Sequence, residues 1–329
     1  MTGTMRALVG GVAPDWEARD VEVPEPGSGQ IRVRVRAAGV NRADLYMLAG
    51  AYSPNTQTSN IYTAGFELAG EVEAVGEGAG DFAVGDRVMG ATLGAFAEFA
   101  LLDHRHALKV PGSLSFTDAA ALPVALGTEH DALVTLGGLT PGQSVLIVGA
   151  TGSIGLLAIQ LAKVLGAGLV IATTTSDEKA EALTDAGADL VINTRTQNLA
   201  ERVGEATDGT GVDLVLDHVG GQLFAELLLG TKVLGTIVNI GRLAGPETTI
   251  NLDLLSFRRL TVRGTTFSVR TPEERAEVTA ALIPDVLPAV ADGRIRPVID
   301  RIVPLKDAVS AAERLRANET VGKIVLELP

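Results

Sequence analysis

The chain has 329 residues, of which 46% are hydrophobic, 20% charged and 4% aromatic, so it suits two globular domains with aliphatic cores. Its 27 basic and 40 acidic residues give a net charge of −13, which disfavours binding to nucleic acids and to anionic membrane surfaces. The absence of cysteine excludes disulfides, cysteine-ligated zinc and a thiol nucleophile.

No segment has the pattern of a membrane span or a signal peptide. The first nine residues lack a long apolar stretch. The most apolar region, 145–175, contains several glycines together with Gln160 and Lys163, and it divides into strand and helix periods. We therefore expect a cytoplasmic protein.

Residues 1 to about 120 are predicted to be rich in β-strands. Residues 31–36 alternate between aliphatic side chains and arginine, which predicts a half-buried strand with its arginine side outward. We interpret the three arginines as a solvated strand face rather than a phosphate-binding stripe. Further strands are predicted at 66–75, 87–90 and 95–102.

From about Asp118 the pattern changes to short β-branched runs that alternate with helical segments. The predicted strands are 144–148, 169–173, 190–193, 214–217, 236–240 and 260–264. This alternation predicts an α/β fold with a parallel, doubly wound sheet and helices on both faces. The last residues hold two helical segments and a strand at 323–328. We expect them to return to the first domain, which gives a discontinuous domain of 1–124 and 267–329 and a second domain of 125–266.

A glycine motif follows the first strand of the second domain. Residues 149–155 read GATGSIG, and a helix is predicted from Leu156 to Leu165. In a strand–turn–helix context, this A-x-G-x-x-G form of the dinucleotide fingerprint predicts that the helix N-terminus binds a pyrophosphate. Gly152 allows the backbone to approach the anion, and Gly155 allows the helix to pack against the strand. The candidate cofactor-binding residues here are Ala150, Thr151, Gly152, Ser153, Ile154 and Gly155.

The next strand favours NADP over NAD. An NAD site usually has an acidic residue about 20 positions beyond the glycines, for the ribose 2′-hydroxyl. This chain has Thr173, Thr174, Thr175 and Ser176 in that window, and Lys179 is placed to reach a 2′-phosphate. Asp177 and Glu178 argue mildly the other way, but they suit the first turn of a helix.

Besides the glycine motif, five stretches are informative: 37–45 (AAGVNRADL), 85–88 (GDRV), 118–123 (DAAALP), 217–221 (DHVGG) and 321–326 (VGKIVL). Through them the chain resembles, nearly end to end, the zinc-free quinone oxidoreductase branch of the medium-chain dehydrogenase/reductase superfamily. The stretches 37–45 and 321–326 look especially like the p53-inducible quinone oxidoreductase-like subgroup. The resemblance implies a GroES-like β-rich catalytic domain joined to a Rossmann domain, NADPH as the cofactor, and a homodimer formed through the edges of the Rossmann sheets. The strand at 260–264 has the pattern of such an edge, although a buried strand with a flanking helix would have the same pattern.

The resemblance also argues against a metal. Zinc-dependent relatives need a cysteine and the histidine of a Gly-His-Glu segment, whereas this chain has Phe66 between Gly65 and Glu67. His104 and His106 are interpreted as surface residues rather than ligands. Direct hydride transfer to a quinone or a conjugated carbonyl needs positioning, exclusion of water and hydrogen-bond donors, but no strong base.

The catalytic candidates follow from the same resemblance. Asn41 is expected to hydrogen-bond near the nicotinamide ribose or the substrate oxygen, with Asp44 bracing its segment. Tyr46 and Tyr52 are candidate donors to a reduced quinone oxygen, and the p53-inducible subgroup is similar only at Tyr52. Tyrosines that merely cover apolar surface are the alternative. Thr128 corresponds to a threonine that approaches the nicotinamide.

The family also implies contacts on the cofactor side. Gly241 and Arg242 are expected near the nicotinamide half, Phe267 and Ser268 near the carboxamide, Thr194 near the adenine ribose, and Lys323 within reach of the cofactor. For Asp217, a structural role is at least as well supported as contact with the ligand. His218 is interpreted as having no special role.

Residues 129–131 (Glu-His-Asp) depart from the family pattern. Either they make the pocket more polar, or their side chains face solvent, and we favour solvent because charged residues are rarely buried unless paired.

We therefore predict an NADPH-dependent quinone oxidoreductase. The alternative within the superfamily is an NADPH-dependent enone or enoyl (C=C) reductase, and a remoter one is a non-catalytic NADPH-binding protein. The expected partners are a small-molecule quinone or conjugated carbonyl and a second copy of the chain, with no nucleic acid, membrane or metal.

Overall fold

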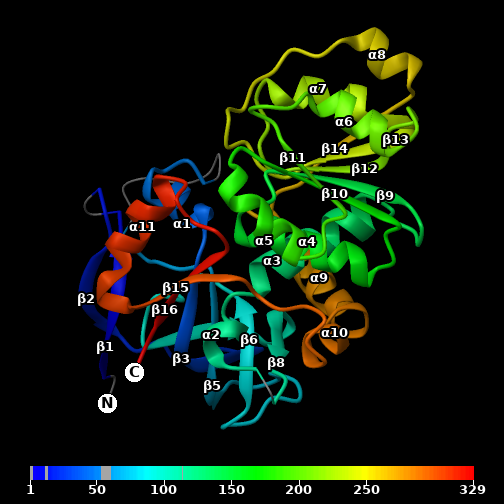
Figure 1. The fold of residues 1–329 in the computed structure, drawn as a ribbon. Coiled ribbons are helices and arrows are strands. Elements are labelled where there is room, and N and C mark those ends of the chain that lie inside the picture. The colour runs from blue at the N-terminus through cyan, green and yellow to red at the C-terminus, as the bar shows by residue number, and fades with distance from the viewer. Residues whose placement is uncertain (1–2, 12–13, 53–60, 113) are drawn as a thin grey trace. The chain divides into compact units, whose positions relative to one another are not determined.

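The computed structural model describes residues 3–11, 14–52, 61–112 and 114–329, which Figure 1 traces in chain order. They form two compact units. The first comprises Met1–Val124, Ser268–Ala291 and Arg296–Pro329, and the second comprises Ala125–Phe267 and Asp292–Ile295. The domain boundaries expected from the sequence differ from these at Phe267 and at 292–295, both of which belong to the second unit.

The first unit contains two sheets. One has the order β2-β1-β4, and its pairs are antiparallel. The other has the order β15-β16-β3-β5-β6-β8, with β7 also paired to β3. The strands are β1 (Thr4–Gly10), β2 (Glu17–Glu22), β3 (Gln30–Val40), β4 (Tyr62–Thr63), β5 (Glu67–Val75), β6 (Arg87–Ala91), β7 (Phe99–Asp103), β8 (Ala107–Lys109), β15 (Ile299–Pro304) and β16 (Lys323–Glu327).

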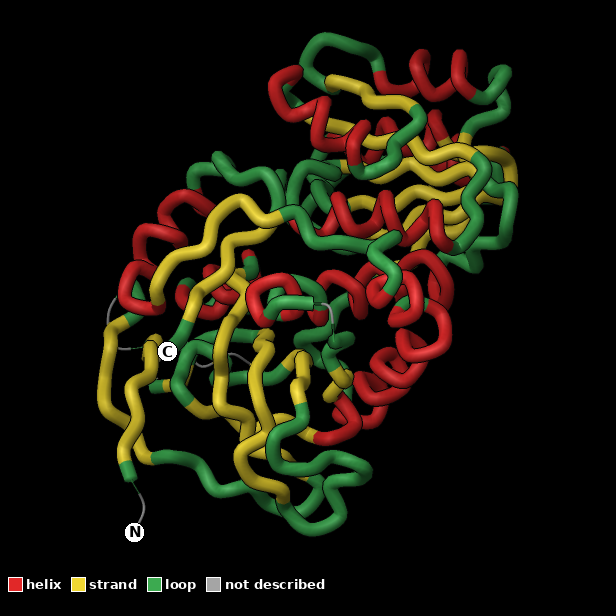
Figure 2. Tube along the Cα trace, turned by 60° about the horizontal axis from the view of Figure 1, so that its bottom comes forward, coloured by secondary structure: helices red, strands yellow, loops and turns green. Residues whose placement is uncertain are grey.

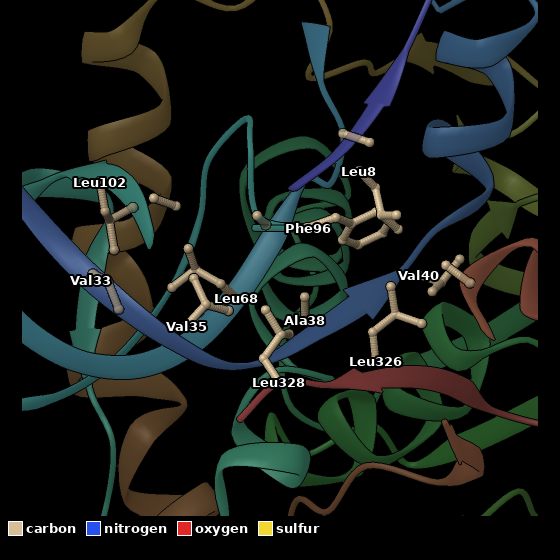
Figure 3. Close-up of a cluster of buried hydrophobic side chains, with 14 of the residues drawn as sticks. Leu8, Val33, Val35, Ala38, Val40, Leu68, Phe96, Leu102, Leu326 and Leu328 are labelled. Carbon is tan, nitrogen blue, oxygen red and sulfur yellow. The ribbon is translucent and has the colours of Figure 1, made fainter. Parts of the chain in front are cut away.

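Strand β3 shows how the period-two pattern builds the core of this unit. Ile31, Val33 and Val35 are buried, and Figure 3 shows the two valines among leucines of neighbouring strands, Leu68 of β5 and Leu102 of β7. The alternating arginines are engaged by side chains of those strands. Arg32 Nε lies 2.6 Å from Glu73, Arg36 lies 3.1 Å from Glu71, and the Arg34 guanidinium lies 4.7 Å from the centre of the Phe99 ring.

The second unit contains a parallel sheet with the strand order β11-β10-β9-β12-β13-β14. Its strands are β9 (Ser144–Val148), β10 (Leu169–Thr174), β11 (Leu190–Asn193), β12 (Val212–Asp217), β13 (Thr231–Asn239) and β14 (Thr261–Gly264). The order runs one way from β9 through β10 and β11 and the other way from β12 to β14. The predicted doubly wound parallel sheet is therefore confirmed.

Helices cover both faces of this sheet, with α4 and α5 on one face and α6 and α7 on the other (Figure 1). The helices of the unit are α3 (Pro123–His130, which begins at the unit boundary), α4 (Ser153–Val164), α5 (Ala180–Asp185), α6 (Leu199–Ala206), α7 (Leu223–Gly230) and α8 (Leu252–Phe257). Those of the first unit are α1 (Arg42–Leu48), α2 (Phe116–Ala119), α9 (Pro272–Asp285), α10 (Leu287–Ala291) and α11 (Ala308–Arg316), and Figure 2 shows the strands and helices in separate colours.

The differences from the predicted elements have local causes. Strand β13 begins five residues before its predicted start at 236, in a stretch where 232–234 are exposed and Leu234 has φ +67°, so no buried pattern marks it. Strand β15 was not predicted, because it lies at the edge of its sheet, carries Asp300 and Arg301 and ends at a proline. Within the described residues, no helix combines the length and the apolar character needed to cross a bilayer.

Candidate functional site

The segment after β9 makes a tight turn into α4. Gly149 has φ +74°, and its N–H donates to the hydroxyl of Thr173 at 2.9 Å. A Cβ atom at Gly149 would lie 2.6 Å from Cγ2 of Val219, and one at Gly155 would lie 2.5 Å from Cα of Ala150. Packing therefore requires glycine at both positions, and Gly155 allows α4 to approach the turn closely.

Gly152 is different, because nothing in the protein requires a glycine there. Its φ of −77° and ψ of 166° suit any residue, and a Cβ atom would meet nothing within 4 Å. Gly152 is the N-cap of the 12-residue helix α4, which has no side-chain cap and no acidic residue in its first turn. The first backbone N–H groups and the positive end of the helix dipole therefore have no side-chain cap and no acidic side chain beside them. This arrangement fits the pyrophosphate of a dinucleotide.

The segment after β10 carries several hydroxyl side chains, and its first carboxylate, that of Asp177, is already hydrogen-bonded within the protein. Thr174 is buried and its hydroxyl donates to the carbonyl of Ser176 at 3.1 Å, whereas Thr175 is exposed. Asp177 accepts a 2.7 Å hydrogen bond from the Asn193 amide, and Lys179 closes the short 3-10 turn that starts at Asp177.

Thr194, at the end of the next strand, donates from its hydroxyl to the carbonyl of Thr174 at 3.3 Å. On the other half of the sheet, the N–H of Gly241 donates to the carbonyl of Asp217 at 3.0 Å, and a Cβ atom there would overlap the carbonyl of His218. Arg242 beside it is exposed, while Phe267 and Ser268 are partly buried after β14. The contacts of these residues with the cofactor stay predictions.

In the first unit, Asn41 is the centre of a buried polar cluster. Its amide Nδ2 donates to Glu67 Oε1 at 2.8 Å and to the carbonyl of Gly39 at 3.3 Å, and its Oδ1 accepts from Lys323 Nζ at 2.7 Å. Lys323 also pairs with Glu67 Oε1, and Glu67 Oε2 accepts from the N–H of Val124 at 2.8 Å. Asn41, Glu67 and Lys323 are 5%, 0% and 1% exposed.

This cluster limits what Asn41 can do. Both hydrogens of its amide are engaged, so it has no N–H for a substrate oxygen, but Oδ1 keeps a lone pair that can accept from a ribose hydroxyl. The geometry favours the ribose over the substrate oxygen as the partner of Asn41, and either contact stays a prediction. The ammonium of Lys323 contacts Asn41 and Glu67, and its contact with the cofactor also stays a prediction. Sequence reasoning missed Glu67, although an acidic residue between Phe66 and Leu68 in an apolar strand is itself a signal of a buried partner.

Asp44 braces the same segment. Its Oδ2 accepts from the N–H of Asn41 at 2.8 Å, which completes a capping box at the start of α1. Burial raises the pKa of Asp44 to about 8. Its Oδ1 is buried with no partner among the described residues.

The two candidate tyrosines differ in their surroundings. The Tyr52 ring packs against Phe66, the residue at the metal-ligand position of zinc-dependent relatives, with ring centroids 4.6 Å apart. Burial raises the pKa of the Tyr52 hydroxyl, which therefore stays protonated at neutral pH and can donate a hydrogen bond. Tyr46 lies on α1 and is 39% exposed.

The expectation for residues 129–131 was wrong. Glu129, His130 and Asp131 do not face solvent but are 0%, 2% and 2% exposed, after a Thr128 that is itself buried. Glu129 is buried because it is paired, with its Oε1 2.9 Å from Nε2 of His218. The partner is 89 residues away in the chain, so no local pattern could indicate it.

His218 therefore has a defined structural role, which the sequence interpretation missed. Its Nδ1 lies 2.9 Å from the carbonyl of Val148, so its ring joins the ends of β9 and β12 to α3. Burial by itself lowers the pKa of His218, but the Glu129 carboxylate and the hydrogen bonds outweigh it, and the pKa is raised above 6.5. Its neighbour Asp217 accepts hydrogen bonds from the N–H groups of Val219 and Gly220 and from the Asn239 amide, which is the structural role considered for it.

Comparison with known proteins gives the class of this two-unit molecule. The family model of the alcohol dehydrogenase GroES-like domain matches residues 27–112, and that of zinc-binding dehydrogenase matches 153–283. The chain is 35% identical over 312 residues to the quinone oxidoreductase of Pseudomonas aeruginosa, covering 94% of each chain. It is 34% identical over 320 residues to 2-haloacrylate reductase of a Burkholderia species, again covering 94% of each.

The structure of Escherichia coli quinone oxidoreductase complexed with NADPH matches with a TM-score of 0.85 at 31% identity, over 99% of this chain and 100% of that one. The molecule is thus an oxidoreductase with a GroES-like domain and a Rossmann domain. The chain belongs to the medium-chain dehydrogenase/reductase superfamily, in its zinc-free quinone oxidoreductase branch, as its resemblance implied.

Proposed function

We propose that this protein is an NADPH-dependent quinone oxidoreductase. The observation that carries the proposal is the open, uncapped N-terminus of α4 at Gly152, where the protein itself has no need for glycine. Quinone oxidoreductases of Pseudomonas aeruginosa and Escherichia coli are among its relatives, and the second was solved with NADPH.

The residues beyond β10 support NADPH over NADH. The first acidic side chain after β10 is that of Asp177, and its carboxylate accepts a 2.7 Å hydrogen bond from the Asn193 amide. The exposed hydroxyl of Thr175 and the ammonium of Lys179 suit a 2′-phosphate better than a 2′-hydroxyl.

In this reading NADPH supplies the hydride, and the chain supplies positioning and hydrogen bonds. Tyr52 is the candidate donor to the acceptor oxygen that gains negative charge, because its hydroxyl keeps its proton while its ring is held against Phe66. Asn41, fixed by Glu67 and Lys323, accepts from a ribose hydroxyl. Thr128 remains a candidate for contact with the nicotinamide.

The test is the rate of NADPH oxidation with 1,4-benzoquinone, 9,10-phenanthrenequinone, an enone and crotonyl-coenzyme A. We expect turnover with the quinones and a loss of about tenfold to a hundredfold in kcat/KM in Tyr52→Phe, because one donor to the developing charge is removed. Tyr46→Phe is the matched control and should change kcat/KM by less than about threefold, since Tyr46 is exposed and a surface substitution usually has a small effect. Equal rates in the two variants would contradict the role given to Tyr52.

A second candidate is reduction of a C=C bond conjugated to a carbonyl or carboxylate. It is favoured by one observation, the similarity to 2-haloacrylate reductase, which is nearly as strong as that to the quinone oxidoreductase of Pseudomonas aeruginosa. Turnover of the enone or of 2-chloroacrylate alone would support this candidate and exclude the first.

We also propose that the protein forms a homodimer through β14. All four residues of this edge strand are exposed, and apolar side chains lie on it and on the preceding helix α8, with Val262 44% and Phe257 81% exposed. An unpaired strand edge flanked by apolar side chains is suited to pairing with a second copy.

A further inference from the structure

The pair formed by Glu129 and His218 lies where the strand order of the Rossmann sheet reverses. Val148 ends β9 and Asp217 ends β12, the two are register partners, and His218 spans both strand ends. Open α/β sheets bind their ligands in the crevice at this point. The glycine turn begins with the next residue after Val148, and a Cβ atom at Gly149 would lie 3.7 Å from Cβ of His218. The imidazole is therefore adjacent to the turn that begins the dinucleotide motif.

The contacts of the ring fix how many hydrogens it carries. The carbonyl of Val148 can only accept, so Nδ1 must be the donor of that 2.9 Å bond. Nε2 and Glu129 Oε1 are 2.9 Å apart, and one hydrogen must lie between them, since two lone pairs would repel at that distance. The pair shares this hydrogen and has no net charge. Loss of the hydrogen leaves a neutral imidazole facing a buried carboxylate, with a net charge of −1.

Glu129 Oε2 is buried with no partner among the described residues, so His218 is what compensates the carboxylate. Asp217, the second carboxylate that acts on His218, accepts hydrogen bonds from the N–H groups of Val219 and Gly220 and from the Asn239 amide. His130 and Asp131, which follow Glu129 in the chain, are buried beside it.

We propose that Glu129 and His218 are positioning residues of the dinucleotide site, and that the dinucleotide binds tightly only while the pair holds its shared proton. The inference rests on the cofactor site proposed above. Deprotonation places a negative charge next to the turn that receives an anionic pyrophosphate. It also leaves the ring with a single hydrogen, so His218 can no longer donate to both Val148 and Glu129, and the link between α3 and the ends of β9 and β12 is weakened.

The direction of the pH dependence follows from this. Although burial alone lowers it, the pKa of His218 is raised by the Glu129 carboxylate and by hydrogen bonds, so the pair loses its shared proton at a higher pH than an ordinary histidine would. Affinity for the dinucleotide should therefore fall as the pH rises, and binding at alkaline pH should take up a proton. The 2′-phosphate of NADPH titrates near pH 6, so it does not contribute above about pH 7.5.

Calorimetric titration of the full chain with NADPH tests this, from about pH 7 to about pH 9.5, in buffers with different ionisation enthalpies. We expect a decrease in affinity of roughly tenfold across this range, and uptake of a fraction of a proton at the alkaline end. Glu129→Gln retains a hydrogen bond to Nε2 without a shared proton and should remove both effects. Glu201→Gln, an exposed carboxylate on α6, is the matched control and should behave as the wild type.

The outcomes separate this inference from the proposed function. Tight NADPH binding by the wild type with a flat pH profile and no proton uptake overturns the inference and leaves the proposed function standing. A pH profile that Glu129→Gln shares with the wild type overturns it as well. Absence of NADPH binding at every pH overturns the proposed function and the inference together. Because proton uptake is measured on the wild type, the test does not depend on the folding of the variant.

Discussion

Lys323 is a charged residue that the protein holds in its interior. Its ammonium is within hydrogen-bonding distance of the Glu67 carboxylate and of Asn41 Oδ1, so its charge and two of its donors are satisfied there. Glu67 in turn accepts from Asn41 and from the N–H of Val124. Such a pair specifies one arrangement of its neighbours more than it adds net stability, because the desolvation of both charges opposes their attraction. Here the neighbour that it fixes is the candidate residue Asn41.

Removing one partner of this pair should therefore be costly. Lys323→Met leaves the Glu67 carboxylate buried without its counter-charge, and we expect the free energy of unfolding to fall by about 3–5 kcal/mol. The measurement is urea denaturation, followed by circular dichroism. Lys163→Met is the matched control, because Lys163 and Asp189 form a pair that is a third exposed on both sides, and its cost should stay below about 1 kcal/mol.

The double variant Lys323→Met/Glu67→Gln provides the second measurement. The glutamine side chain is uncharged, and its oxygen can still accept from Asn41 or from Val124, so the double variant should be more stable than Lys323→Met alone. If the double variant is as unstable as Lys323→Met, or is less stable, then the charge of Glu67 is not what makes the loss of Lys323 costly.

At the scale of elements, the start of α4 combines two kinds of glycine. At Gly149 and Gly155 the neighbouring atoms leave no room for a side chain, whereas at Gly152 the space is open. The motif alone does not separate these roles, since all three positions read as glycine. In the structure only Gly152 of the three has room for a side chain. A substitution at Gly152 therefore tests ligand binding rather than folding.

Gly152→Ala should therefore weaken the cofactor without harming the fold. The added methyl group meets no protein atom but occupies space at the N-terminus of α4, and we expect Kd for NADPH to rise at least about tenfold while Tm stays within about 2 °C. Equilibrium binding by fluorescence and thermal denaturation measure the two quantities. The control is Gly204→Ala in α6, where a Cβ atom would likewise meet no protein atom. It should raise Tm slightly, because alanine favours a helix over glycine, and leave Kd unchanged. An unchanged Kd in Gly152→Ala would place the pyrophosphate elsewhere.

For the whole molecule, periodicity and motif spacing were enough to predict the doubly wound sheet. Strands β9 and β11 have their predicted bounds because each is a compact apolar run between turn residues. The polar contacts were beyond such reasoning. Glu67 and Lys323 are 256 positions apart, and Glu129 and His218 are 89 apart, so the burial of each charge depends on a partner that only the folded chain brings near. A rule that charged residues face solvent therefore failed at Glu129, where a distant histidine offsets the cost of burial.

The proposed homodimer can be tested at the edge of the Rossmann sheet. If two copies pair through β14, a lysine on that strand should prevent pairing, because its charge would be desolvated beside its symmetry mate. We expect the wild type to have the mass of a dimer, and Val262→Lys that of a monomer, in light scattering coupled to size-exclusion chromatography. Val84→Lys replaces a valine that is 68% exposed in the GroES-like domain, and it should leave the dimer intact. A monomeric wild type, or a dimeric Val262→Lys, would show that β14 is not the interface.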